Sequence, residues 1–334
     1  MEQLHTNHKA LLKPLRQALY NFDRVSVLNE LNHVLASDAV VKLSYPFETL
    51  HGAQTFFDIA YQPLNNAIPD LERRETIVMA GDSEDGSHWV GMCGYYTGSF
   101  EKSWLDIPPT GHQVSMRFHE FYRIKNNKVV EIQAIWDVPE VMIQAKAWPM
   151  VPSLGREWHV PAPATQDGLS IQENHLSASS IKLVEDMCNS LGNYATGGVE
   201  AMELEKYWHP KCSWYGPSGI GTGRGIKGFR NWHQIPFLNG MPNRVGDVEK
   251  GYLFGDGNYV GFTAWPGMQM TISNDGWLGI APANQQITMR SLDFWRCENG
   301  VIRENWVLVD ILHVYHQIGV DVLARMREFN KARC

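Results

Sequence analysis

The sequence contains few cysteines, and their positions argue against two classes of protein. The 334 residues include Cys93, Cys188, Cys212, Cys297 and Cys334, an odd number without C-x-x-C spacing. Disulfide frameworks and structural zinc sites require paired or closely spaced cysteines. We therefore expect reduced thiols, no metal site and a cytoplasmic location.

Long apolar runs and blocks of positive charge are also missing. No stretch approaches the roughly 20 apolar residues that cross a bilayer, and the N-terminal segment MEQLHTNHKALLKPL has no signal-peptide core. Lys and Arg total 29 against 36 Asp and Glu, without a basic cluster that would neutralise phosphates. We expect no membrane partner and no nucleic-acid partner.

Aromatic residues, in contrast, are abundant. The chain has 12 Trp, 12 Tyr and 13 Phe, many of them interleaved with polar residues on strand-like runs. Such a pattern suits either a large core or a deep apolar pocket with a few polar groups, as in small-molecule sites. The second interpretation predicts a small apolar or aromatic molecule as the partner.

One segment of the chain occurs twice. Residues 116–144 and 289–317 align without a gap at an offset of 173 residues (289 − 116), and nine positions are identical, where chance gives about two. The identical pairs are Met116/Met289, Arg117/Arg290, Phe121/Phe294, Arg123/Arg296, Asn126/Asn299, Glu131/Glu304, Asp137/Asp310, Val141/Val314 and Gln144/Gln317. The period is too long for a solenoid, so each copy should form a domain.

A proline-rich stretch separates the two copies. Residues 148–170, WPMVPSLGREWHVPAPATQDGLS, show little periodicity and are typical of a linker. We predict one domain at 1–147, the linker at 148–170 and a second domain at 171–334. The two domains should form an internal pseudo-dimer, with homodimerisation of the chain as a further option.

Both copies show the same order of predicted elements, helices first and an antiparallel meander afterwards, which is typical of an α+β fold. Asn-Asn-Lys and Glu-Asn-Gly separate the last two strands as tight hairpin turns. The expected helices are 8–21, 24–36, 52–61, 175–193, 198–208 and 225–234; the expected strands are VVKLSY and CSWYG, and, in the second copy, 244–254, 258–272, 285–298 and 301–310.

The second copy resembles a SnoaL-like polyketide cyclase domain of the NTF2-like superfamily. The resemblance rests on residues 214–229, WYGPSGIGTGRGIKGF, and 289–319, with the pattern R-x-x-x-F-x-R, a turn, E-x-W, and an Asp followed seven residues later by Gln. The first copy is similar but less faithful, because Gln133 stands where the second copy has Trp306.

The resemblance implies two cone-shaped α+β barrel domains in tandem, each a curved, mostly antiparallel sheet wrapped on N-terminal helices around a pocket. In this family an aspartate of the pocket acts as general acid/base in ring closure by an intramolecular aldol step, without a cofactor. Asp310, and Asp137 in the first copy, match that aspartate. The superfamily also holds isomerases, dehydratases and ligand-binding proteins, so fold alone does not settle function.

Three hypotheses follow. The first is a cofactor-independent acid/base enzyme, a cyclase, isomerase or lyase acting on a small, largely apolar carbonyl compound. The second is a non-catalytic protein that binds a small molecule in the same pocket. The third is an interaction module whose two cones are filled. The better-kept motif of the second copy favours a division of labour, with an active second domain and a structural first domain.

The residues around Asp310 leave two roles open. In RENWVLVD (303–310), Glu304, Trp306 and Leu308 share one strand face that ends in Asp310. A poorly solvated carboxyl has a raised pKa, which suits a general base near neutral pH. Alternatively, Asp310 caps the following helix, since Asp is a preferred N-cap. Asp137 poses the same choice.

Further candidates for substrate binding are aromatic residues and histidines near the motif: Trp306, Tyr215, Trp214, His209, His233, His313 and Trp136. Tyr215 could donate a hydrogen bond to a developing oxyanion, and His313 could share a proton with Asp310. Packed aromatics and structural histidines are the alternatives. The repeated arginines suggest an ion-pair ladder with Glu131 and Glu304.

Overall fold

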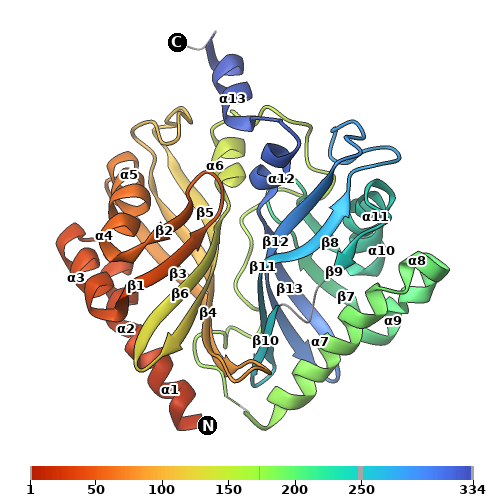
Figure 1. The fold of residues 1–334 in the computed structure, drawn as a ribbon, viewed down its shortest axis with the longest axis horizontal. Coiled ribbons are helices and arrows are strands. Elements are labelled where there is room, and N and C mark those ends of the chain that lie inside the picture. Colours follow the sequence, from red (N-terminus) through yellow and green to blue (C-terminus); the bar gives the residue numbers. More distant parts are fainter. Residues whose placement is uncertain (1, 173, 247–250, 332–334) are drawn as a thin grey trace. The chain divides into compact units, whose positions relative to one another are not determined.

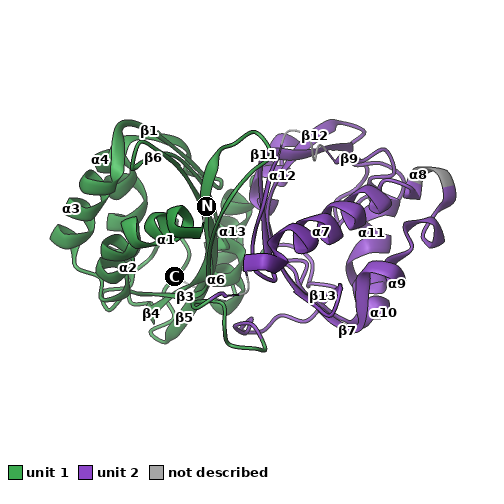
Figure 2. Cartoon of the chain, turned by 90° about the horizontal axis from the view of Figure 1, so that it is seen from below, with its two compact units in different colours: residues 1–149, 164–170, 321–334 green, residues 150–163, 171–320 purple. Residues whose placement is uncertain are grey.

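The chain forms two compact units in a computed structural model that describes residues 2–172, 174–246 and 251–331 (Figures 1 and 2). Unit 1 comprises residues 1–149, 164–170 and 321–334, and unit 2 comprises 150–163 and 171–320. The stretch predicted as a linker is thus shared between the units, and the C-terminal segment from Asp321 groups with unit 1. The pseudo-dimer and the homodimer stay predictions.

Unit 1 begins with helices and continues into one six-stranded sheet. Its strands lie in the order β2-β1-β6-β5-β4-β3, with β1 and β6 parallel and the other neighbours antiparallel. The elements are α1 (Glu2–Leu11), α2 (Lys13–Tyr20), α3 (Arg24–Val34), β1 (Leu35–Leu43), β2 (Glu48–His51), α4 (Gly52–Phe56), the π-helix η1 (Phe57–Tyr61), α5 (Gln62–Ala67), β3 (Glu72–Asp82), β4 (His88–Ser99), β5 (Gln113–Lys125), β6 (Lys128–Trp136), α6 (Val138–Gln144) and α13 (Val322–Asn330).

Unit 2 repeats this order. Its main path of strands is β10-β11-β12-β13-β7-β8, β9 pairs with β11, and β7 and β13 are parallel. The elements are η2 (Asn174–Leu176), α7 (Ser177–Leu191), α8 (Tyr194–Gly197), η3 (Glu200–Met202), α9 (Leu204–Tyr207), β7 (Trp208–Tyr215), β8 (Thr222–Arg224), α10 (Gly225–Phe229), the π-helix η4 (Arg230–Gln234), α11 (Ile235–Gly240), β9 (Val245–Gly246), β10 (Tyr252–Asp256), β11 (Tyr259–Thr271), β12 (Gln286–Glu298), β13 (Val301–Val309) and α12 (Ile311–Gln317).

The α+β class is confirmed in both units. Neither sheet closes into a barrel in the part of the chain that the structure describes, since each strand order has two free ends. The predicted hairpin turns are also confirmed: Asn126 and Asn127 have φ of 53° and 56°, and Asn299 and Gly300 have φ of 52° and 77°. Positive φ at both central residues matches the right-handed twist of the flanking strands.

Two predicted elements differ in the structure. The single helix over 198–208 is wrong, because Glu203 adopts a left-handed φ of 45° between η3 and α9, and Trp208 already begins β7. The strand over 244–254 is present only as β9 and the start of β10, and residues 247–250 lie outside the described residues. The first difference has a local cause, because the left-handed residue Glu203 interrupts the helical hydrogen-bond pattern.

The last two strands of unit 2 present two different faces. The register pairs Phe294 with Trp306 and Leu292 with Leu308 on one face. Asp293 pairs with Val307 on the other face, which α7 and the helices α10 to α11 cover (Figure 1). Both faces are buried, as the burial of nearly every residue of β13 shows.

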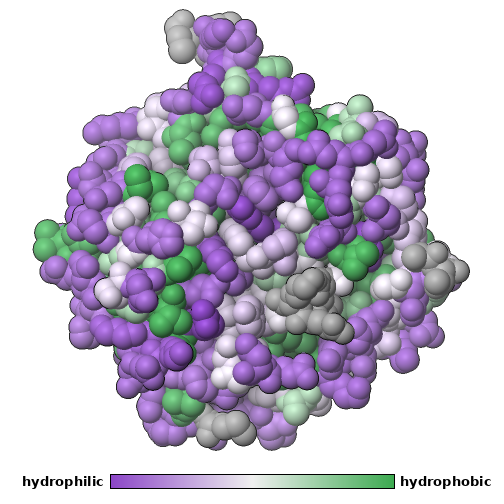
Figure 3. Space-filling view, in the orientation of Figure 1, coloured by the Kyte–Doolittle hydropathy of each residue, from purple (hydrophilic) through white to green (hydrophobic). Residues whose placement is uncertain are grey.

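The visible surface is mostly polar, with apolar residues scattered among charged ones (Figure 3). Of the helices that the structure describes, none combines the length and the apolar character that a membrane crossing needs.

Candidate functional site

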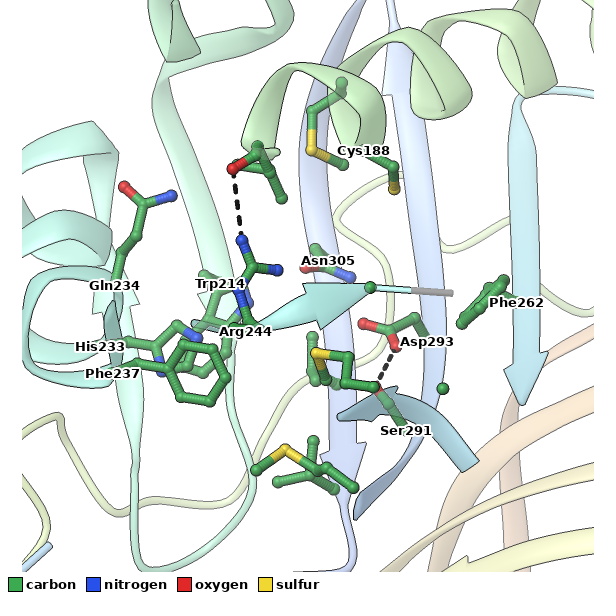
Figure 4. A pocket seen from close by; sticks show the side chains of 18 of the residues that line it. Cys188, Trp214, His233, Gln234, Phe237, Arg244, Phe262, Ser291, Asp293 and Asn305 are labelled. Carbon is green, nitrogen blue, oxygen red and sulfur yellow. Dashed lines mark hydrogen bonds between the residues drawn. The ribbon is translucent and has the colours of Figure 1, made fainter. Parts of the chain in front are cut away.

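Unit 2 contains a cavity of about 510 Å³ between its sheet and its helices (Figure 4). Most of the lining is apolar. Met187 comes from α7, Phe237 from α11, Phe262 from β11, and Met289 and Val307 from β12 and β13. Small-molecule sites have this character when a few polar groups converge on them.

Among the described residues, Asp293 is the carboxylate that lines this cavity. It projects from β12 on the helix-covered face and is 8% exposed. Ser291 Oγ donates to its Oδ2 at 2.6 Å (Figure 4). Burial raises the pKa of Asp293 to about 7 from an ordinary 3.8, against the opposing effect of hydrogen bonds from Ser291 and Asn305. A carboxyl with this pKa can both take and return a proton at neutral pH.

An aromatic wall lies on the helical side of the cavity. The rings of Trp214 and His233 stack with centroids 4.0 Å apart and planes 10° apart, and Phe237 lies 5.3 Å from His233. Burial, with a contribution from the charge of Arg244, lowers the pKa of His233 to about 3. The imidazole is therefore neutral at physiological pH and forms part of a flat, uncharged surface.

Several polar atoms of the cavity wall are buried without a hydrogen-bond partner among the described residues. They are Trp208 Nε1, Trp295 Nε1, Arg244 Nε, His233 Nδ1 and Gln234 Oε1, and each of these residues lines the cavity. Native proteins rarely leave buried polar groups unsatisfied. These atoms belong to residues of the cavity wall, which therefore holds donors and acceptors next to the cavity.

Cys188 also lines the cavity, but its chemistry is unsuited to nucleophilic attack. Burial, followed by the charge of Asp293, raises the pKa of its thiol to about 12. The thiolate is the reactive form of cysteine, so this side chain stays protonated and acts as a small apolar group.

Asp310 lies outside the set of residues that line this cavity. Its Oδ1 accepts a hydrogen bond from the backbone N of His313 at 3.2 Å, and its Oδ2 is 3.0 Å from Arg290 Nη1. It therefore caps α12 and forms a buried ion pair. Asp137 forms the corresponding ion pair, in which it accepts a hydrogen bond from Arg117 Nη2 at 2.8 Å, but its side chain makes no cap hydrogen bond to α6.

Of the predicted substrate-binding residues, Trp214 and His233 line the cavity, whereas Tyr215, Trp306, His209, His313 and Trp136 do not. Tyr215 donates to Glu304 Oε1 at 3.1 Å and Trp306 to the carbonyl of Pro161 at 3.1 Å. The reason is strand alternation: Glu304, Trp306 and Leu308 lie on the face opposite the cavity.

The two remaining histidines have local partners. His209 Nδ1 lies 3.0 Å from Arg303 Nη1, and His313 Nδ1 lies 3.2 Å from Gln317 Nε2. The predicted ladder is confirmed in part: Arg123 pairs with Glu131 at 2.9 Å and Arg296 with Glu304 at 2.6 Å. The other two repeated arginines pair with the aspartates instead, Arg117 with Asp137 and Arg290 with Asp310.

Comparisons with known proteins identify the family. The family model described as SnoaL-like polyketide cyclase matches residues 15–145 and 199–318, most of the chain. The chain belongs to the SnoaL-like polyketide cyclase family. A comparison with functionally curated proteins found no match.

The solved structures that this chain resembles each cover less than half of it. AclR from Streptomyces galilaeus, described as a candidate hydroxylase, is 20% identical over 44% of this chain and 86% of its own, with a TM-score of 0.36. IdmH from Streptomyces antibioticus, described as a candidate polyketide cyclase, is 18% identical over 42% and 98%, with a TM-score of 0.35. A candidate SnoaL-like polyketide cyclase from Jannaschia Sp. CCS1 is 17% identical over 41% and 90%, also at 0.35.

In the first SnoaL-like copy, a different acidic residue occupies the position that corresponds to Asp293. The repeat offset places Glu120 there (293 − 173), and this carboxylate is fully buried. It accepts hydrogen bonds from Arg73 Nη1 at 2.5 Å, Tyr122 OH at 2.5 Å, Trp136 Nε1 at 2.9 Å and Tyr96 OH at 3.0 Å. With these four donors, Glu120 is a structural ion-pair partner.

The SnoaL-like pattern thus directs attention to Asp310, whereas the cavity acid is Asp293, which the sequence analysis missed. One signal was available. An acid occupies the same repeat position in both copies, Glu120 and Asp293. A search for identical pairs overlooks it because the two acids differ. For Arg244, also missed, we find no such signal, because it lies outside the aligned repeat.

Proposed function

We propose that unit 2 is a cofactor-independent acid/base catalyst for a small, largely apolar carbonyl compound, with Asp293 as the group that moves the proton. The observation that supports it is a buried carboxyl with a pKa of about 7 inside an apolar cavity of about 510 Å³. Near neutrality Asp293 is present in both forms, so one group can act as base and then as acid.

The proposed reaction begins when the Asp293 carboxylate takes a proton from a carbon next to the substrate carbonyl. Ser291 holds the carboxylate in place by a hydrogen bond, and the nearby amide of Asn305 favours its charged form. The resulting enolate oxygen needs hydrogen-bond donors, and the residues of the cavity wall include two indole N–H groups, of Trp208 and Trp295, without a partner among the described residues. Such donors stabilise the charge that develops in the transition state.

The fate of the enolate decides the reaction type. In ring closure, its carbon attacks a second carbonyl of the same molecule, a C–C bond forms, and the new alkoxide recovers the proton from Asp293. In an isomerisation, the proton returns to a different carbon. Both outcomes conserve atoms and electrons without an added reactant, and membership of the polyketide cyclase family supports the first.

The test is deuterium exchange into a simple activated ketone, 2-tetralone, in D₂O at neutral pD, followed by proton NMR. Wild-type protein should accelerate exchange next to the carbonyl, and Asp293→Asn should lower the rate by about 10² or more, as expected for loss of a general base. Asp310→Asn is the matched control, because it removes the aspartate that forms the cap. Thermal unfolding of each variant confirms that it is folded.

The opposite pattern, with loss of exchange in Asp310→Asn and normal exchange in Asp293→Asn, would restore Asp310 to the catalytic role implied by the family resemblance. A second candidate function is non-catalytic binding, favoured by the unpartnered polar atoms of the cavity. Binding of a ligand without any exchange would support that function.

A further inference from the structure

The cavity of unit 2 contains a positive charge that is unusual for this protein. Arg244 lines the cavity next to the aromatic wall, with its guanidinium carbon 5.9 Å from the centre of the Phe237 ring (Figure 4). Its Nη2 donates to the carbonyl of Leu191 at 3.3 Å, and its Nε is buried without a partner among the described residues. Burial lowers the pKa of this guanidinium, but arginine keeps its charge in proteins.

Arg244 is partly exposed, whereas four arginines elsewhere in the described residues are buried, and these four differ from it in having a carboxylate partner. Arg73 lies 2.5 Å from Glu120, Arg117 2.8 Å from Asp137, Arg290 3.0 Å from Asp310 and Arg296 2.6 Å from Glu304. Each of these charges is neutralised by a carboxylate. Within 2–172, 174–246 and 251–331, no carboxylate lies within salt-bridge distance of Arg244.

Asp293 does not serve as that counter-ion. Its pKa is raised by burial and lowered by Ser291 and Asn305, with no contribution from a positive charge. An adjacent guanidinium would favour the charged carboxylate and lower the pKa. The acid and the arginine are therefore separate features of one cavity.

We infer that the cavity selects an aryl carboxylate, whose aromatic ring lies along the wall of Trp214, His233 and Phe237 and whose carboxylate pairs with Arg244. An anionic group would pair with a guanidinium that has no carboxylate partner among the described residues, and a carboxylate matches the fork of a guanidinium. This inference rests on the proposed function, since the same cavity holds the substrate, and it adds the chemical class of that substrate.

The test compares two probes of equal shape, 2-naphthoate and 2-naphthamide, by isothermal titration calorimetry at pH 6, where Asp293 is mostly protonated. Wild-type protein should bind the carboxylate at least about 10-fold more tightly than the neutral amide, because a charge-assisted pair outweighs a neutral hydrogen bond. Arg244→Met should abolish that preference, and Arg244→Gln provides a polar alternative should the first variant be unstable.

Arg224→Met is the matched control. Arg224 belongs to the same unit, ends β8 and donates to Ser213 Oγ at 2.7 Å, outside the cavity lining. Its replacement removes the same net charge and should leave the preference for naphthoate intact. A similar loss in both variants would point to a general effect of charge and would overturn the assignment of Arg244.

Equal affinity of the wild-type protein for the two probes, or no binding of either at millimolar concentration, would also overturn the inference. The exchange assay keeps the proposed function separate, because 2-tetralone is neutral. Ketone exchange without a preference for naphthoate leaves the acid/base proposal standing and refutes the substrate class. A preference for naphthoate without ketone exchange supports the substrate class and refutes the acid/base proposal.

Discussion

Replacement of Asp293 by asparagine should stabilise unit 2 at alkaline pH. The folded protein holds this carboxyl at a pKa of about 7, against 3.8 ordinarily. A raised pKa means that the folded state binds more protons than the unfolded state between these two values. Its stability must therefore fall as the pH rises from about 4 to about 7, and then level off. Asparagine does not titrate, so the variant escapes this loss.

The size of the effect follows from the two pKa values. The interval from 3.8 to about 7 corresponds to about 4 kcal/mol of unfolding free energy, at 1.36 kcal/mol for each pH unit. A practical pH range for the measurement begins at pH 5.5, where part of this loss of unfolding free energy has already occurred. Between pH 5.5 and 8.5 the stability difference between variant and wild type should grow by about 2 kcal/mol.

Urea unfolding at several pH values, followed by near-ultraviolet circular dichroism, measures this difference. Any pH-independent effect of the substitution cancels, since only the change with pH is compared. Asp186→Asn is the control, because it removes the same charge from α7 in the same unit, where the side chain is 43% exposed and pairs with Lys182. A stability difference for Asp293→Asn that stays constant from pH 5.5 to 8.5 would refute the burial argument.

Three other predictions concern the remaining ionisable groups. Asp310→Asn should lower the unfolding free energy by about 3 kcal/mol, because it leaves the buried Arg290 without its carboxylate, and urea unfolding at pH 7 measures this loss. Glu120→Gln should also lower the unfolding free energy, because the buried Arg73 loses the nearer of its two carboxylate partners and keeps Glu75. Calorimetry should show unchanged binding of 2-naphthoate to this variant; weaker binding would mean that unit 1 takes part. The imidazole of His233, with a pKa of about 3, should show constant NMR shifts from pH 5 to 8, and a midpoint in that range would contradict its burial.

The fold could be predicted from the sequence because the repeated residues are those that build the sheet. Arg296 and Glu304 face each other across the β12–β13 hairpin, as Arg123 and Glu131 do across β5–β6. Buried ion pairs tolerate few substitutions, since the loss of one partner leaves an uncompensated charge. Identical residues therefore pointed to the framework, and with the hairpin turns they predicted the α+β class.

The site was less accessible, for a reason that lies in β13. Alternation separates the residues of a strand into two faces, but it identifies the core face only when the other face is exposed. Both faces of β13 are buried. The sequence therefore grouped Trp306 with Asp310 correctly, yet could not show that the cavity lies on the side of Asn305.

The helical side of the cavity was missed for a different reason. Arg244 follows α11 and precedes the short β9, and its neighbours carry no periodic pattern. Only the folded chain brings it beside Phe237 and the end of α7. Contacts of this kind depend on tertiary packing and leave no local signal in the sequence.

The two π-helical turns bear on how the tandem chain arose. Phe57–Tyr61 and Arg230–Gln234 are separated by the same 173 residues as the repeated strands, and a π-turn is a local expansion of an α-helix, often at a functional site. A shared expansion in identical register indicates that the ancestor already had it before the gene segment was duplicated. Ala60 now stands where the later copy has His233. Backbone shape was inherited by both descendants, and the chemistry of the side chains diverged afterwards.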